Sequence, residues 1–114
     1  MTIQRSLKQA TESFIAGTNA FNADAVVALF ASNATIDDPS TGHTFLGHAG
    51  IRDYVQRYFV GYNTATRLLS LKELAENQAL ARVDFTGDFG HEIGRLLIAV
   101  DPAGLITRID ADLE

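Results

Sequence analysis

The sequence predicts an α+β fold in which helices from the first half cover one face of a curved, mainly antiparallel sheet. Two observations predict this class. Apolar residues recur at helical spacing in three segments of the first half, whereas the second half contains four consecutive strand-like segments separated by turn residues. The length of 114 residues fits one domain over 1–114, and a hydrophobic content of 46% is enough for a packed core.

Three helices are expected. The first covers residues 3–16, and the segment 17–21 is predicted to end it because it contains Gly17. Asn22 is a candidate N-cap for a second helix over 23–31. The third helix is predicted over 49–60. Its apolar face consists of Ile51, Tyr54, Val55, Tyr58 and Phe59.

Six strands are expected around these helices. Two short ones, 34–38 and 44–46, lie between the second and third helices, and Pro39 ends the first because proline favours extended geometry in the residue before it. The four later strands are predicted over the segments 64–76, 79–89, 91–101 and 105–113.

Alternation along the later strands predicts which side chains face the helices. The inner rows are Ala79, Ala81, Val83 and Phe85 in one strand and Leu105, Thr107, Ile109, Ala111 and Leu113 in the last. The outer rows are Leu80, Arg82, Asp84 and Thr86, and Ile106, Arg108, Asp110, Asp112 and Glu114. The segment 95–100 is apolar on both sides, as in a central strand or one covered by a second subunit. Two interpretations stay open: a homodimer through the outer face around Leu97, or a solvated charged face.

Composition and charge exclude several function classes. Nine basic and 14 acidic residues give a net charge of −5, which argues against nucleic acid as a partner. No apolar run is long enough to span a membrane. The absence of Cys excludes disulfides and thiolate chemistry. Residues 1–6 lack the apolar segment of a secretory signal, and we expect a cytoplasmic protein.

Asp38 is the strongest candidate for chemistry. It ends a strand directly before Pro39, next to helices rich in Phe and Tyr. A carboxylate at the mouth of an apolar pocket loses hydration, which makes it a better general base. The alternative is a structural role, because Asp before Pro often caps a turn. Asp37 precedes it in the strand and should point to the opposite face.

Other polar residues give weaker signals. Tyr54, Tyr58 and Tyr62 lie one helical turn apart. Tyr54 and Tyr58 either offer phenol donors to a ligand or belong to the core. His43 and His48 are five residues apart with no obvious third ligand, so we expect packing or exposure and no metal site.

An Asp–Arg–Asp set can activate water. Such residues occur here at Arg82, Asp84, Asp110 and Asp112. They lie in the predicted outer rows, so surface or interface ion pairs are expected instead.

Four segments carry a family resemblance: 14–20, 26–31, 34–39 (ATIDDP) and 47–52 (GHAGIR). Their succession resembles the ketosteroid isomerases and, more broadly, the NTF2-like superfamily with its SnoaL-like polyketide cyclases. The resemblance implies a cone-shaped sheet wrapped by three helices, an apolar pocket at the open end and a homodimer. It also implies that Asp38 is the base that moves a proton beside a carbonyl.

Two positions depart from the isomerases. Their oxyanion donors fall at Phe14 and at about Leu96 here, and neither side chain can donate a hydrogen bond. The related epoxide hydrolases carry a polar set inside the cone. The corresponding inner positions here read Val83, Phe85, Leu96, Ile98, Ile109 and Ala111, which disfavours that activity.

The resulting hypothesis is a SnoaL-like or ketosteroid-isomerase-like protein that holds a small apolar molecule, with Asp38 as general base and without a cofactor or metal. The expected pocket lining is Phe14, Phe30, Tyr54, Tyr58, Val83, Phe85, Leu96, Ile98, Ile109 and Leu113, together with Asp38. The alternatives are a non-catalytic binding module and a dimerisation scaffold whose own side chains fill the pocket.

Overall fold

A computed structural model describes residues 7–114, so the start of the predicted first helix and the segment 1–6 lie outside the described residues. The first half comprises α1 (Leu7–Asn19), α2 (Ala23–Val27), β1 (Phe30–Asp38), the 3₁₀ turn η1 (Pro39–Thr41), β2 (His43–Leu46), α3 (Gly47–Val55) and the π-helical turn η2 (Gln56–Val60). The second half comprises β3 (Ala65–Ala75), β4 (Gln78–Gly87), β5 (Gly90–Val100) and β6 (Ile106–Leu113).

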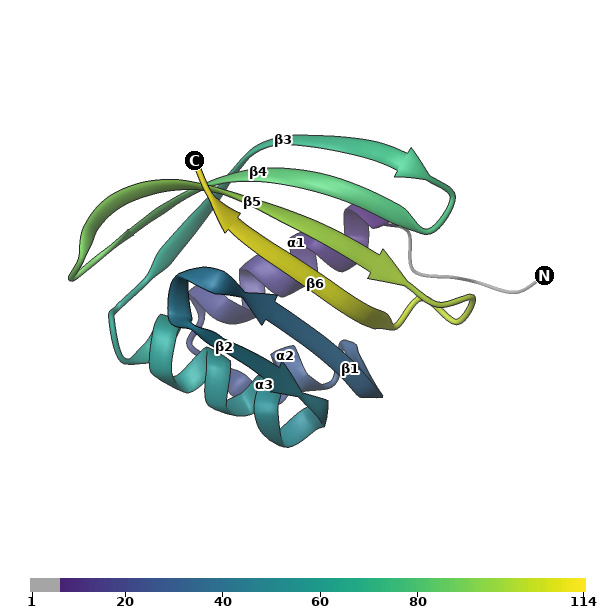
Figure 1. Cartoon of the computed structure of the whole chain (residues 1–114), viewed down its shortest axis with the longest axis horizontal. Coiled ribbons are helices and arrows are strands. Elements are labelled where there is room, and N and C mark those ends of the chain that lie inside the picture. The colour runs from purple at the N-terminus through teal and green to yellow at the C-terminus, as the bar shows by residue number, and fades with distance from the viewer. Residues whose placement is uncertain (1–6) are drawn as a thin grey trace.

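The six strands form one sheet in the order β2-β1-β6-β5-β4-β3. The β1–β6 pair is parallel and every other pair is antiparallel. In Figure 1 the long strands β3 to β6 arch over α1, while β1, β2 and α3 lie below them. This arrangement confirms the α+β class and the curved sheet wrapped by three helices. Within residues 7–114, no helix is long and apolar enough to cross a membrane.

The ends of the first two helices differ from the prediction, and the third helix begins at Gly47, two residues before its predicted start. Helix α1 continues through Gly17 to Asn19. Glycine at position 17 allows α2 to pack closely, because a Cβ there would lie 2.8 Å from Cγ2 of Val26. Helix α2 ends at Val27, well before residue 31, because Phe30 already pairs with Ile106 of β6. The predicted N-cap is confirmed, since the Asn22 side chain accepts a hydrogen bond from the backbone N–H of Ala25 at 3.1 Å.

The end of α1 explains where the chain turns. The N–H of Phe21 donates to the carbonyl of Thr18 at 3.1 Å, and the N–H of Asn22 donates to that of Gly17 at 3.0 Å. This pair of hydrogen bonds is a Schellman motif, which places Phe21 at the position that glycine usually occupies. Phe21 accordingly has φ 54°, in the left-handed region that costs a residue with a Cβ about 1–2 kcal/mol.

Replacement of Phe21 should reverse the usual ranking of glycine and alanine. We expect Phe21→Gly to be more stable than Phe21→Ala by about 1 kcal/mol, because both lose the ring and only glycine relieves the backbone. Urea unfolding of the two variants measures the difference. The control is Ala16→Gly on the exposed side of α1, which should instead lose about 1 kcal/mol. Equal stability of the two Phe21 variants would contradict the strained geometry.

The predicted inner row of β4 is confirmed, because Ala79, Ala81 and Val83 are fully buried. The prediction for β6 is wrong at its start: Ile106 is fully buried, although alternation had placed it on the outer face. The reason is a shift in pairing with β5, where Val100 pairs with Ile106 but Ala99 pairs with Arg108. One extra residue in β6 therefore reverses the alternation between Ile106 and Ile109.

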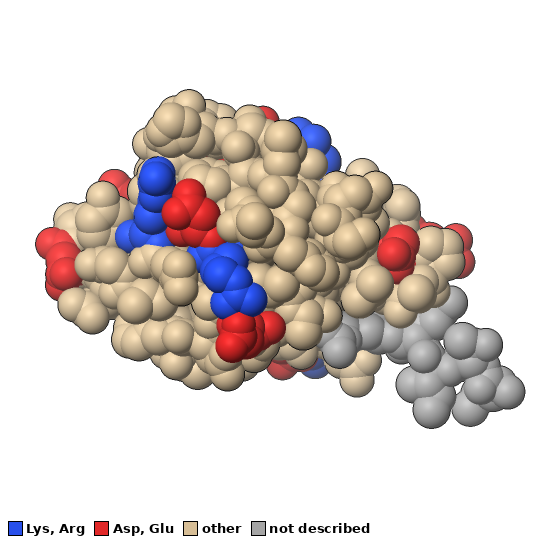
Figure 2. Space-filling model, turned by 90° about the horizontal axis from the view of Figure 1, so that it is seen from below, with Lys and Arg blue, Asp and Glu red and all other residues tan. Residues whose placement is uncertain are grey.

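Two ion pairs lie on the helix side of the molecule. Arg52 of α3 contacts Asp24 of α2, and Arg57 lies 3.1 Å from Asp53 one turn earlier. Figure 2 shows the face seen from below, where acidic and basic side chains lie next to one another on a mostly uncharged surface. This face therefore offers no continuous basic surface to a phosphate backbone.

Candidate functional site

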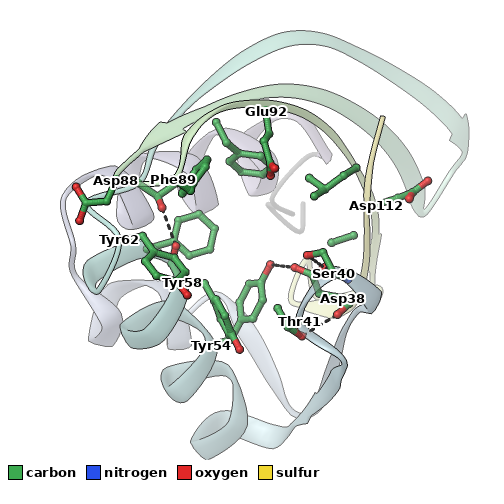
Figure 3. Close-up of a pocket in the computed structure, with 15 residues that line it drawn as sticks. Asp38, Ser40, Thr41, Tyr54, Tyr58, Tyr62, Asp88, Phe89, Glu92 and Asp112 are labelled. Atoms are coloured by element: carbon green, nitrogen blue, oxygen red, sulfur yellow. Dashed lines mark hydrogen bonds between the residues drawn. The ribbon is translucent and has the colours of Figure 1, made fainter.

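A cavity of about 440 Å³ opens at one end of the curved sheet (Figure 3). It lies between the turns η1 and η2, the β4–β5 hairpin and the end of β6. Its wall consists of Asp38, Ser40, Thr41, Tyr54, Tyr58, Phe59, Tyr62, Thr64, Phe85, Asp88, Phe89, Glu92, Ala111, Asp112 and Leu113.

Asp38 lies in this wall at the end of β1, and its relative exposure is only 7%. Its Oδ1 accepts hydrogen bonds from the backbone N–H of Ser40 at 3.1 Å and from the Ser40 hydroxyl at 2.6 Å. Asp38 therefore caps the turn η1, which is the structural role given as the alternative in the sequence analysis. It also faces the cavity. Asp37 points the other way, as predicted: its carboxylate lies 3.7 Å from Arg108 on the opposite side of the sheet.

Tyr54 connects α3 to this carboxylate. Its hydroxyl donates to Oδ2 of Asp38 at 2.7 Å (Figure 3). Burial, the negative charge of Asp38 and this hydrogen bond together raise the pKa of Tyr54 well above its usual value of 10.0. The phenol is therefore held in its protonated, donating form. The pair forms one polar part of a wall that combines aromatic rings with hydroxyl and carboxylate side chains.

All three tyrosines of the stripe line the cavity. Ring centroids are 5.6 Å apart for Tyr54 and Tyr58, and 5.9 Å apart for Tyr58 and Tyr62. The stripe crosses the change from α3 to η2, where the N–H of Gly61 donates to the carbonyl of Gln56 five residues earlier. Such π-helical turns change which side chains share a face and often occur at functional sites.

The structure places five of the predicted site residues in the cavity wall: Asp38, Tyr54, Tyr58, Phe85 and Leu113. The other six lie elsewhere, in the hydrophobic core. These are Phe14, Phe30, Val83, Leu96, Ile98 and Ile109, each at most 2% exposed. The reason is that helix α1 lies under the arch of the long strands and contacts β3, β4 and β5 (Figure 1). Phe14 of this helix packs edge-on against Phe30 and Phe59, at centroid distances of 6.0 and 6.3 Å.

The other ten residues of the wall are absent from the expected lining. They are Ser40, Thr41, Phe59, Tyr62, Thr64, Asp88, Phe89, Glu92, Ala111 and Asp112. Strand alternation could have found Glu92, because it lies four residues before Leu96 and shares its face. No comparable signal exists for Asp88 and Phe89, which belong to the β4–β5 turn.

His43 of β2 and His48 of α3 have separate environments. A ring nitrogen of His48, Nε2, lies 2.9 Å from the carbonyl oxygen of Phe30. The ring of His43 packs edge-on against Phe45 at 6.3 Å. Among the residues that the structure describes, no three His, Cys, Asp or Glu side chains are grouped so that they could hold a metal ion.

The outer rows of the sheet carry ion pairs, as expected. Arg108 pairs with Asp110 at 2.9 Å, whereas Arg82 pairs with Glu114 at 2.8 Å. Asp84 lies 3.2 Å from Arg67. An Asp–Arg–Asp set therefore does not form inside the curved sheet, since these side chains lie on its convex face.

Solved structures share this fold at low sequence identity. An NTF2-like protein of unknown function from Cytophaga hutchinsonii superposes with a TM-score of 0.82 at 16% identity, covering 100% of this chain and 95% of its own. A protein with a ketosteroid isomerase-like fold from Catenulispora acidiphila, solved in complex with trimethylamine, gives 0.80 at 16% identity and covers 90% and 83%. The epoxide hydrolase/cyclase-like enzyme SalBIII, which has a role in pyran ring formation in salinomycin, gives 0.82 at 19% and covers 94% and 89%.

A search of the curated proteins finds no significant relative. The pattern of the SnoaL-like domain matches residues 11–108, so it extends from α1 into β6 and covers most of the chain. It covers the four segments on which the resemblance rested, and the shared fold agrees with it. This chain therefore belongs to the SnoaL-like domain family.

Proposed function

We propose that the cavity binds a small, largely apolar molecule and that Asp38 abstracts a proton from a carbon beside its carbonyl group. One observation carries this proposal: a carboxylate that is only 7% exposed lies in the wall of a 440 Å³ cavity. Ligand pockets usually measure about 300–1,000 Å³, so the volume suits a small molecule and argues against a scaffold filled by its own side chains.

The hydrogen bonds of Asp38 leave room for this chemistry. A carboxylate has about four lone-pair positions. Two hydrogen bonds from Ser40 and one from Tyr54 orient the group, and they leave one position for the substrate. The proton would pass from carbon to this oxygen, while the C–H electron pair moves into the carbonyl to give an enolate. Return of the proton to the same or a neighbouring carbon completes an exchange or an isomerisation.

The enolate oxygen needs a hydrogen-bond donor. Phe14 and Leu96, at the positions of the isomerase donors, cannot supply it, because their side chains lie in the core and have no polar hydrogen. The hydroxyl of Tyr54 is already bonded to Asp38. Tyr58 lies next to it in the cavity wall, and a phenol there can supply a substitute donor.

Deuterium uptake tests the proposal. The protein is incubated in D₂O with a panel of enolisable ketones, steroids and polyketide-like diketones, and mass spectrometry follows deuterium incorporation. Uptake by the wild type, lost in Asp38→Asn, is the expected result. A wild type that produces no uptake above the buffer rate with any member of the panel would contradict the catalytic role.

The second candidate is a non-catalytic binding module. It is favoured by the two core residues that replace the isomerase donors and by the three hydrogen bonds that Asp38 already accepts. In that case Asp38 would anchor a polar group of the ligand. The same panel distinguishes the two candidates, because a binding module would bind a member of the panel without deuterium exchange.

We also propose that two copies of the chain associate through the convex face of the sheet. Leu80 and Leu97 lie opposite each other in β4 and β5 and are half-buried on this face. Arg82 and Arg108 on this face are already paired with Glu114 and Asp110. Burial of the face in a dimer would therefore not leave these two arginines without a partner. Sedimentation should show a dimer for the wild type and a monomer for Leu97→Arg. A monomeric wild type would instead support the solvated face.

A further inference from the structure

The charges of the cavity wall have a single sign. The wall contains four carboxylate residues, Asp38, Asp88, Glu92 and Asp112, and no Lys, Arg or His. Two of them turn away from the cavity in Figure 3. Asp88 accepts hydrogen bonds from Asn63 at 3.2 and 3.3 Å, and Asp112 pairs with Arg95 at 2.5 Å. Asp38 and Glu92 therefore supply the negative charge that the cavity itself presents.

Glu92 points from β5 into the space that the sheet encloses (Figure 3). It pairs across the strands with Phe85 of β4, and residues directly opposite in a pair share a face of the sheet. Phe85 in turn packs on Phe59 at a centroid distance of 6.2 Å. Among the described residues, the Glu92 side chain has no hydrogen-bond or ion-pair partner, in contrast to the other three carboxylates. Glu92 is exposed at the cavity mouth, so its charge is accessible to a ligand that enters there.

Aromatic rings surround the same space. Tyr62 packs on Phe89 at 6.2 Å, and both rings line the cavity together with Tyr58 and Phe85. The face of an aromatic ring attracts a cation within about 6 Å of its centroid. A carboxylate without a partner beside several rings is the combination that recognises an ammonium group, whereas it repels an anion.

We propose that the molecule bound here carries a protonated amine, which Glu92 and the neighbouring rings hold at the cavity mouth while the apolar body extends toward Asp38. This inference rests on the proposed binding of a small molecule in the cavity. It adds the chemical class of that molecule: an amine with an apolar or aromatic body, and neither a neutral hydrocarbon nor a carboxylic acid.

Three probes with one indole body test the charge preference. Tryptamine is a cation at neutral pH, tryptophol is neutral and indole-3-acetate is an anion. Isothermal titration at low salt measures their affinity for the wild type, for Glu92→Gln and for Glu12→Gln. Glu12 is exposed on α1 and does not line the cavity, so this variant controls for the loss of one negative charge.

We expect tryptamine to bind the wild type about tenfold more tightly than tryptophol, and indole-3-acetate to bind most weakly. Glu92→Gln should remove most of the preference for tryptamine over tryptophol, while the rings and Asp38 keep a smaller one. Glu12→Gln should leave both affinities unchanged. Equal affinity for tryptamine and tryptophol, or an unchanged affinity for tryptamine in Glu92→Gln, would overturn the inference.

The failure of this inference is distinguishable from that of the proposed function. Binding of tryptophol without a preference for tryptamine would refute the amine and keep the cavity as a site for apolar molecules. Binding of no probe would also overturn the inference, while deuterium exchange tests Asp38 separately.

Discussion

Asp38→Asn should lower the rate of deuterium exchange into a carbonyl substrate by about 10²- to 10⁴-fold, the usual contribution of a general base. An amide oxygen of nearly the same shape cannot take a proton from carbon at neutral pH. Asparagine is also a good cap, and its oxygen can still accept the hydrogen bond from the N–H of Ser40. The fold around η1 should therefore survive, and the loss of rate should reflect chemistry.

The matched control is Asp37→Asn, one residue earlier in β1. It makes the same chemical change on the opposite side of the sheet, near Arg108. We expect its exchange rate to equal that of the wild type, and both variants to keep the wild-type circular dichroism spectrum. If Asp38→Asn retained the full rate, the base would have to be another group. If both variants lost activity equally, the effect would be one of folding or charge.

The second large effect is expected on stability. Phe14→Ala should reduce the free energy of unfolding by about 3–5 kcal/mol, the usual cost of removing a buried aromatic ring. Phe14 is 2% exposed and packs against Phe30 and Phe59, so its truncation leaves a hole between α1, β1 and η2. Urea unfolding measures the loss. Phe14→Leu, which should lose less, keeps the measurement possible if the alanine variant does not fold.

Phe89→Ala is the control for this effect. Phe89 lies at the cavity mouth and is 43% exposed, so its truncation should cost less than about 1 kcal/mol. The two positions thus separate a core residue from a residue of the cavity wall. A loss below 1 kcal/mol for Phe14→Ala would show that the ring is not in a tightly packed core, and would favour the predicted position in the pocket.

Local patterns in the sequence were sufficient for the α+β class and for the faces of most strands. The inner row of Ala79, Ala81 and Val83 follows from alternation alone, because a period of two leaves each side chain one choice of face. The same rule places Asp37 and Asp38 on opposite sides of the sheet. The four segments that carry the resemblance also indicated the SnoaL-like family. The pattern of that family's domain matches residues 11–108 of the chain.

Only the tertiary structure decided how far each inward side chain lies from the cavity. Leu96 and Glu92 share one face of β5, yet Leu96 is 2% exposed in the core and Glu92 lines the cavity. The difference depends on where α1 packs inside the curved sheet. Alternation along a strand shows which face of the sheet a side chain occupies. It does not show whether that side chain lies in the core or in the cavity wall, because contacts between distant segments decide this. Tyr54 and Asp38 likewise meet only because α3 packs against β1 and so brings the phenol to the carboxylate.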